Sequence, residues 1–212
     1  VKIFKKNTTG WSQITTIEGG ETSSSLFGSA ISLDSTGDVI AVGAYWDGGS
    51  NSTGNPNNPS PGFAKIYRNN SGIWTQIGQT IYGTNISDHF GYRISLSNDG
   101  NRVAIGAYNN RSDSPGTYLK IYEFDGNSWN EIKSFNNFGS GLAMSGDGKS
   151  VAFNNHLNLF PLNDNLINLN GQVFIYENKN NTWSLKGNVI TDTQHSYIGE
   201  NISLNNDAVS YT

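Results

Sequence analysis

The chain is 212 residues long, with 35% hydrophobic and 12% aromatic residues, so its core is built from few but large side chains. Only 14% of residues are charged, the formal net charge is −4, and no basic cluster extends beyond Lys5–Lys6, which argues against a nucleic-acid partner. Cysteine is absent, which excludes disulfides and cysteine–zinc sites, and no apolar run reaches the ~20 residues of a membrane-spanning helix.

The surface is predicted to be polar but weakly charged, because the chain contains 30 Asn, 25 Ser, 15 Thr and 25 Gly. The given sequence begins at Val1, with neither a signal-peptide pattern nor an initiator methionine. We therefore expect a processed product or a segment of a longer protein.

One two-part pattern occurs four times along the chain. Its second part ends on a tryptophan and reads KIFKKNTTGW from Lys2, KIYRNNSGIW from Lys65, KIYEFDGNSW from Lys120 and FIYENKNNTW from Phe174. Its first part reads FGSAISLDSTGDVIAVGAY from Phe27, FGYRISLSNDGNRVAIGAY from Phe90, FGSGLAMSGDGKSVAFN from Phe138 and IGENISLNNDAVSYT from Ile198. Such self-similarity indicates one structural unit stacked against copies of itself.

The repeated pattern predicts a unit of four antiparallel strands. In the second copy, bulky residues alternate with small or polar ones along a first strand, and the bulky set is Phe90, Tyr92, Ile94 and Leu96. A turn at 98–101 leads into a second strand at 103–106, a third strand covers 119–123, and a fourth begins near Trp129. Four strands per ~50–60 residues are typical of a β-propeller blade.

The predicted fold is therefore all-β, a β-propeller of four-stranded antiparallel blades in a single domain or segment spanning 1–212. A β-sandwich would not carry a four-fold repeat, and the coils of a solenoid are shorter, at ~20–30 residues. The expected repeats cover 27–81, 90–134, 138–190, and 198–212 joined with 1–17. Two alternatives remain open, a closed four-blade ring and a part of a larger propeller.

The glycine pairs resemble the FG-GAP repeat of integrin-α-type propellers. Phe90-Gly91 is followed fifteen residues later by Gly106-Ala107, and Phe27-Gly28 with Gly43-Ala44 has the same spacing. Phe138-Gly139 lacks the second glycine, since Asn154 occupies its place. The resemblance implies an extracellular or cell-surface propeller used for adhesion or ligand recognition, a fold also found in some secreted enzymes and lectins.

The chain departs from that family in two ways. Tyr45 and Tyr108 replace the proline of the Gly-Ala-Pro triplet, and the calcium loop is absent. The turns at 98–100, 146–148 and 35–38 each offer only one carboxylate, and so short a turn cannot supply the six or more oxygen ligands that calcium needs. We therefore expect ordinary hairpin turns, no metal and no cofactor.

Catalytic motifs are also missing from the sequence. The three histidines lack zinc-site spacing, and the chain has no Gly-x-Ser-x-Gly elbow, no phosphate-binding glycine loop and no sialidase box. We predict a non-enzymatic protein without catalytic residues. A glycan-active enzyme is the less favoured alternative, built on carboxylates scattered among the blades: Glu18, Asp47, Asp88, Asp113, Asp192 and Glu200.

The predicted binding face is formed by the connections between the second and third strands, because loops on a rigid scaffold commonly carry recognition. We expect protein binding, adhesion or self-assembly at the surface of a cell or particle or outside it, without insertion into a membrane. A lectin-like carbohydrate-binding face is the alternative, since aromatic rings beside amides suit sugars. The candidate binding residues are Tyr45, Trp46, Asp47, Tyr108, Asn109, Asn110 and Arg111.

Overall fold

The computed structural model describes residues 1–19, 26–45, 61–85, 88–108, 117–155, 171–192 and 198–206. These residues form sixteen strands in four antiparallel sheets, and no helix occurs among them. Accordingly, nothing in the described part of the chain is a helix that could span a membrane. The prediction of an all-β fold is confirmed.

The first sheet is a two-stranded N-terminal hairpin of β1 (Lys2–Asn7) and β2 (Gly10–Thr16). Blade 1 consists of β3 (Ala30–Leu33), β4 (Val39–Ala44), β5 (Phe63–Asn70), β6 (Ile73–Gln76) and β7 (Ile81–Tyr82). Blade 2 consists of β8 (Phe90–Leu96), β9 (Arg102–Ala107), β10 (Tyr118–Phe124) and β11 (Trp129–Asn136). Blade 3 consists of β12 (Leu142–Met144), β13 (Ser150–Asn155), β14 (Gln172–Lys179), β15 (Thr182–Leu185) and β16 (Ile190–Thr191).

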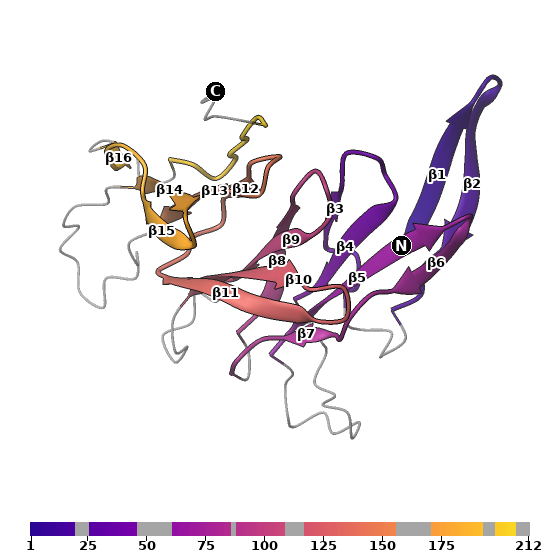
Figure 1. Cartoon of the computed structure of the whole chain (residues 1–212), viewed down its shortest axis with the longest axis horizontal. Coiled ribbons are helices and arrows are strands. Elements are labelled where there is room, and N and C mark those ends of the chain that lie inside the picture. Colours follow the sequence, from indigo (N-terminus) through magenta and orange to yellow (C-terminus); the bar gives the residue numbers. More distant parts are fainter. Residues whose placement is uncertain are drawn as a thin grey trace, which may run out of the picture.

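The sheets follow one another in chain order, with the N-terminal hairpin at one end and blade 3 at the other (Figure 1). Residues 198–206, which we call the C-terminal segment, lie beside blade 3. Among the described residues, β1 pairs only with β2. The closed four-blade ring, one of the two predicted alternatives, is therefore not the arrangement of this structure, because the two segments that would close it lie at opposite ends.

Most of the apolar core lies between sheets. One cluster joins Ala41 and Ile66 of blade 1 to Leu96 and Ile105 of blade 2. A second joins blade 2 to blade 3, and a third joins the N-terminal hairpin to blade 1. Each blade is thus stabilised mainly by its neighbours, as in other repeat proteins.

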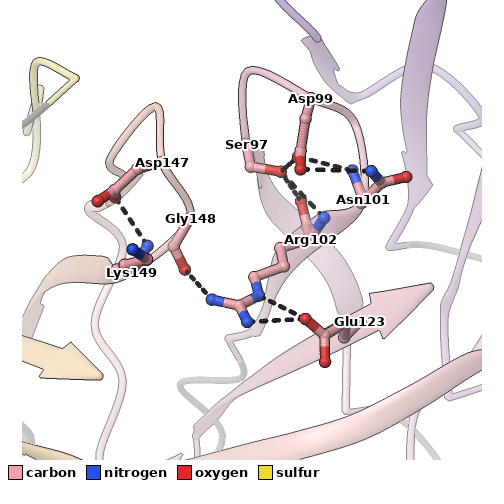
Figure 2. Close-up of polar contacts among 8 residues, drawn as sticks. All are labelled: Ser97, Asp99, Asn101, Arg102, Glu123, Asp147, Gly148 and Lys149. Carbon is pink, nitrogen blue, oxygen red and sulfur yellow. Dashed lines mark hydrogen bonds and ion pairs between the residues drawn. The ribbon is translucent and has the colours of Figure 1, made fainter. Parts of the chain in front are cut away.

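A serine–aspartate pair closes the turn between the first two strands of blade 2 (Figure 2). The Ser97 hydroxyl donates to Asp99 Oδ1 at 2.6 Å and accepts from the Arg102 amide at 2.9 Å. Burial would raise the pKa of Asp99, but hydrogen bonds from Ser97 and Asn101 outweigh it and keep the pKa below its usual value. The same contacts recur in blade 3 at Ser145, Asp147 and Ser150. The predicted hairpin turns are confirmed.

Blade 1 builds this turn with the two side chains exchanged. Asp34 stands at the position of Ser97, and Thr36 stands at the position of Asp99. The Thr36 hydroxyl donates to Asp34 Oδ2 at 2.6 Å, and Asp34 Oδ1 accepts from the Val39 amide at 2.9 Å. A hydroxyl–carboxylate pair is therefore what repeats, in either order.

Polar contacts also run from blade to blade. Arg102 of β9 pairs with Glu123 of β10 through Nη2 at 2.7 Å, and its Nη1 donates to the Gly148 carbonyl of blade 3 at 3.3 Å (Figure 2). One guanidinium therefore links two strands of its own blade to a turn of the next.

The first turns of successive repeats contact one another at equivalent positions. The Ser35 amide donates to the Asn98 carbonyl at 3.1 Å, and the Asn98 amide donates to the Gly146 carbonyl at 2.8 Å. The Asn98 side chain also donates to Asn206 Oδ1 at 2.7 Å. Turns from four repeats thus lie together, which places the C-terminal segment as the first strand region of a fourth repeat.

The first residue of each repeat is Phe27, Phe90, Phe138 or Ile198, and equivalent positions of stacked repeats are expected to be similarly buried. Phe90 and Phe138 are fully buried, whereas Phe27 and Ile198 are only partly buried. The difference follows from position, since Phe27 neighbours an incomplete preceding sheet and Ile198 belongs to a repeat without described outer strands. The register is still maintained: Phe27 stacks on Phe63 at 6.4 Å and 28°, and Phe90 stacks on Tyr118 at 6.0 Å and 29°.

Replacing Phe90 by Ala should lower the free energy of unfolding by about 3–5 kcal/mol, because a fully buried ring would leave a cavity between blades 1 and 2. Ile73→Ala is the control, since that side chain is 68% exposed, and it should change stability by less than about 0.5 kcal/mol. Denaturant unfolding measures both. Equal losses of stability in the two variants would show that Phe90 is not the buried residue that the alignment of the repeats requires.

Candidate binding face

Three tyrosines from two blades form one aromatic cluster. Tyr45 follows β4 of blade 1, Tyr108 follows β9 of blade 2, and Tyr92 of β8 lies between them. The ring of Tyr92 is 5.4 Å from Tyr45 in an edge-to-face arrangement and 5.1 Å from Tyr108. These spacings are those of favourable aromatic pairs. All three tyrosines are half-buried.

Two cationic or polar residues complete the cluster. The guanidinium of Arg93 lies 4.5 Å from the centroid of the Tyr92 ring, within the range of a cation–π contact. The His89 ring lies 5.8 Å from that of Tyr45, and His89 Nδ1 is 3.2 Å from the Tyr108 carbonyl oxygen. We call Tyr45, His89, Tyr92, Arg93 and Tyr108 the tyrosine cluster.

A β-bulge places Tyr92 in this cluster. Phe90 pairs with Ala107 and Arg93 pairs with Gly106, so two residues of β8 fit between adjacent positions of β9. Gly91 adopts a φ of 88°, which favours glycine. The predicted alternation is therefore wrong at Tyr92: Phe90 and Leu96 are buried in the interblade core, whereas Tyr92 turns toward the other two tyrosines.

A buried carboxylate fixes the segment that leads into the cluster. Asp88 is fully buried, and its Oδ2 accepts hydrogen bonds from the Tyr118 hydroxyl at 2.6 Å and from the amides of Thr84 and Asn85 at 3.0 and 2.7 Å. Burial and the hydrogen bond to Asp88 both raise the pKa of Tyr118, so its hydroxyl remains a donor. Asp88 thus holds the connection from blade 1 to blade 2 against β10, directly before His89.

The structure brings together two of the seven predicted binding residues, Tyr45 and Tyr108. The other five lie outside the described residues: Trp46, Asp47, Asn109, Asn110 and Arg111. Sequence reasoning missed His89, Tyr92 and Arg93 as members of the cluster. The glycine of the Phe-Gly pair, placed immediately before Tyr92, was the available signal for the bulge.

A second feature is a cavity of about 200 Å³ at the junction of blades 2 and 3. Aromatic and amide side chains line it: Phe135, Asn136, Asn137, Phe153, Asn155, Phe174 and Tyr176. Asn155 is the last residue of β13, so the cavity lies at the end of the second strand of blade 3. Tyr45 and Tyr108 lie at the ends of the second strands of blades 1 and 2. Rings beside amides are suited to hydrophobic and hydrogen-bonding contacts with one small ligand.

The described part of the chain contains no group of three or more His, Asp or Glu residues able to hold a metal ion. Asp88 is engaged by Tyr118 and two amides. Asp47 and Asp113 lie outside the described residues.

No protein-family model and no curated protein sequence matches this chain. Among solved structures it is similar to a putative 6-phosphogluconolactonase from Bacteroides uniformis, with 11% identity and a TM-score of 0.53 over 91% of this chain and 51% of that one. It is also similar to Saccharomyces cerevisiae Sqt1, with 12% identity and a TM-score of 0.50 over 82% of this chain and 37% of that one.

Both neighbours are β-propellers, so these similarities show that the fold is of the β-propeller type. The chain spans about half of the lactonase's length and 37% of Sqt1. At such low identity the comparison concerns the fold alone. Membership of the FG-GAP family stays a prediction.

Replacing Tyr118 by Phe should lower the free energy of unfolding by about 1–3 kcal/mol, because the buried Asp88 carboxylate loses its side-chain donor. Tyr82→Phe is the control at a ring that is 51% exposed, where the loss should be smaller because solvent can replace a lost partner. Thermal or denaturant unfolding measures both variants. An equal loss in the two would mean that the Asp88–Tyr118 bond does not hold the connection in place.

Proposed function

We propose that this chain is a non-enzymatic β-propeller module that binds a protein partner through the tyrosine cluster, outside the cell or on the surface of a cell or particle. The observation that carries the proposal is the contact of three half-buried tyrosines from two blades, with an arginine stacked on the central ring. Tyrosine and arginine are enriched among the residues that contribute most to protein–protein binding energy.

The cluster is well suited to a protein partner because its members are already fixed. Tyr92 is held on both sides by rings from different blades, and Arg93 is held over Tyr92. Binding to an ordered surface loses less side-chain entropy than binding to a mobile one. His89 lies between the Tyr45 ring and the Tyr108 carbonyl, so we assign it a packing role.

The extracellular or surface location rests on two sequence properties. The surface is rich in uncharged polar residues, and the Phe-Gly and Gly-Ala pairs resemble those of integrin-α-type propellers. Adhesion and assembly remain the two forms of protein binding that this location suggests.

Carbohydrate binding is the second candidate function, and the cavity between blades 2 and 3 is the observation that favours it. Asn136 and Asn137 are exposed at its rim, while Phe174 and Tyr176 are half-buried in its wall. Amides can hydrogen-bond sugar hydroxyls, and aromatic rings can stack on the apolar face of a sugar.

A phage-displayed random peptide library selected on the immobilised chain tests the first proposal. Peptides recovered on the wild-type chain should bind the Tyr92→Ala variant at least about tenfold more weakly, a loss of about 1.4 kcal/mol. Tyr82→Ala, at an exposed tyrosine outside the cluster, is the matched control and should bind normally.

Unfolding curves establish that both variants are folded. Peptides that bind Tyr92→Ala and the wild-type chain equally would contradict the proposal. The same proteins on a glycan array distinguish the second candidate: binding that is lost in Asn136→Ala but retained in Tyr92→Ala would favour the carbohydrate site.

A further inference from the structure

The cavity at the junction of blades 2 and 3 lies where blade 3 departs from the repeated sequence. At the end of the second strand, Ala44 of blade 1 and Ala107 of blade 2 are fully buried, and each pairs with an aromatic residue of the third strand. Blade 3 has Asn155 at this position, paired with Gln172. Two residues with amide side chains therefore replace an alanine and an aromatic ring.

The replaced ring has a packing role in blade 2. Phe90, the first residue of that repeat, stacks on Tyr118 with the ring centroids 6.0 Å apart. In blade 3 the counterpart of Phe90 is Phe138, and the counterpart of Tyr118 is Gln172, which has no ring. Because Asn155 both pairs with Gln172 and lines the cavity, the missing ring belongs to the neighbourhood of the cavity.

The junction also lacks a charged pair that blade 2 contains. Lys120 Nζ lies 3.0 Å from Glu131 Oε2, and the equivalent residues of blade 3 are Phe174 and Leu185. Phe174 lines the cavity, and all of the described lining residues are uncharged. Lys133 lies over one lining ring, with its Nζ 5.1 Å from the centroid, but does not itself line the cavity. The cavity is thus suited to an uncharged ligand.

Asn155 is the strongest indication that the cavity is a binding site. The residue is only 7% exposed, and its side-chain amide forms no hydrogen bond with the described part of the chain. A buried amide is costly unless it is hydrogen-bonded, so buried asparagines normally have a partner. Since Asn155 lines the cavity, its donor and acceptor are available to a molecule bound there.

Aromatic rings from both blades form the apolar wall of the cavity. The Phe153 ring lies 5.7 Å from that of Phe174 and 5.8 Å from that of Tyr176, with interplanar angles of 25° and 6°. From blade 2, the Phe135 ring lies 4.5 Å from Tyr176 and 5.2 Å from Phe153. Such contacts fix the rings before any ligand binds, which lowers the entropy lost on binding.

The rim and the size of the cavity limit what it can hold. Asn136 and Asn137 are exposed at the rim, and the Asn137 amide donates to the Thr117 carbonyl at 2.8 Å, which fixes the backbone there. The volume is about 200 Å³, below the ~300–1,000 Å³ of pockets for drug-sized ligands. One small ligand, or one unit of a larger ligand, is therefore the expected occupant.

We propose that this cavity binds a single neutral sugar unit, with the apolar face of the sugar on the aromatic wall and a hydroxyl group on the Asn155 amide. The inference rests on the carbohydrate candidate above, and adds to it the charge and size of the ligand and a residue that determines affinity. An acidic sugar is disfavoured, because its carboxylate would enter a cavity without a charged lining residue.

Titrations followed by saturation-transfer NMR test the class of ligand. The probes are the methyl glycosides of glucose, galactose, mannose and N-acetylglucosamine, and those of glucuronic and galacturonic acid. At least one neutral glycoside should bind the wild-type chain, with the strongest transfer to the protons of its apolar face. The uronic acid that matches it should bind at least about tenfold more weakly.

Asn155→Ala tests the residue, and it should fold because alanine occupies this position in blades 1 and 2. The variant should bind the neutral glycoside at least about tenfold more weakly, with an unchanged or higher melting temperature, because its amide loses no partner within the protein. Asn70→Ala is the matched control at an exposed asparagine of β5 in blade 1 and should bind normally.

The possible failures are distinguishable. Equal binding by Asn155→Ala and the wild-type chain, or stronger binding of the uronic acids, would overturn this inference and leave the carbohydrate candidate standing. A lower melting temperature of Asn155→Ala would assign the amide a structural role and also overturn the inference. A wild-type chain that binds none of the glycosides would overturn the inference and the carbohydrate candidate together.

Discussion

The close approach of backbone between one blade and the next is the constraint on which this fold depends. Gly43 of β4 lies against Gly91 at the start of β8, and a Cβ on Gly43 would collide with the Gly91 carbonyl oxygen. A Cβ on Gly91 would in turn lie 3.3 Å from Gly43 Cα. The glycine of the Phe-Gly pair and the glycine of the Gly-Ala pair are therefore the two sides of one contact between successive repeats.

At the other interfaces between repeats, different residues allow the close approach. Gly106 leaves room for the ring of Phe138, since a Cβ there would overlap that ring. In blade 3, Asn154 replaces the glycine. Its Oδ1 accepts a hydrogen bond from the Gly141 N–H at 2.7 Å, and its Nδ2 donates one to the Ile198 carbonyl at 3.3 Å. At the position of the second glycine of the motif, this side chain therefore hydrogen-bonds both to its own blade and to the C-terminal segment.

Because the cores lie between sheets, every blade face needs a neighbour. The face of β3 and the outward face of the N-terminal hairpin have none in the described structure, and this is where large apolar side chains are exposed. The tyrosine cluster has the same origin, since Tyr45 and Tyr108 come from successive blades and meet through Tyr92. A cluster built across two repeats can form only if the repeats stack correctly.

The sequence was sufficient to predict the strands and turns, because alternation and turn residues are local properties. It also predicted that Tyr45 and Tyr108 would come close, since equivalent residues of stacked repeats share one face. It failed at Tyr92, where a positive φ at Gly91 produces a bulge that an alternating pattern does not reveal. Nor could it choose between a closed ring and an open arrangement, because that depends on the summed geometry of the interfaces.

The free energy of unfolding of a Gly43→Ala variant tests the central claim most directly. Gly43 has no positive φ, so in an unhindered strand alanine would stabilise the protein by roughly 0.5–1 kcal/mol. If Gly43 contacts Gly91 as described, the added methyl group must push blade 2 away from blade 1 and should instead destabilise the protein by about 1–3 kcal/mol. The sign of the change in the free energy of unfolding therefore distinguishes an unhindered strand from a contact with Gly91. Stabilisation by alanine would contradict the stacking of blades 1 and 2.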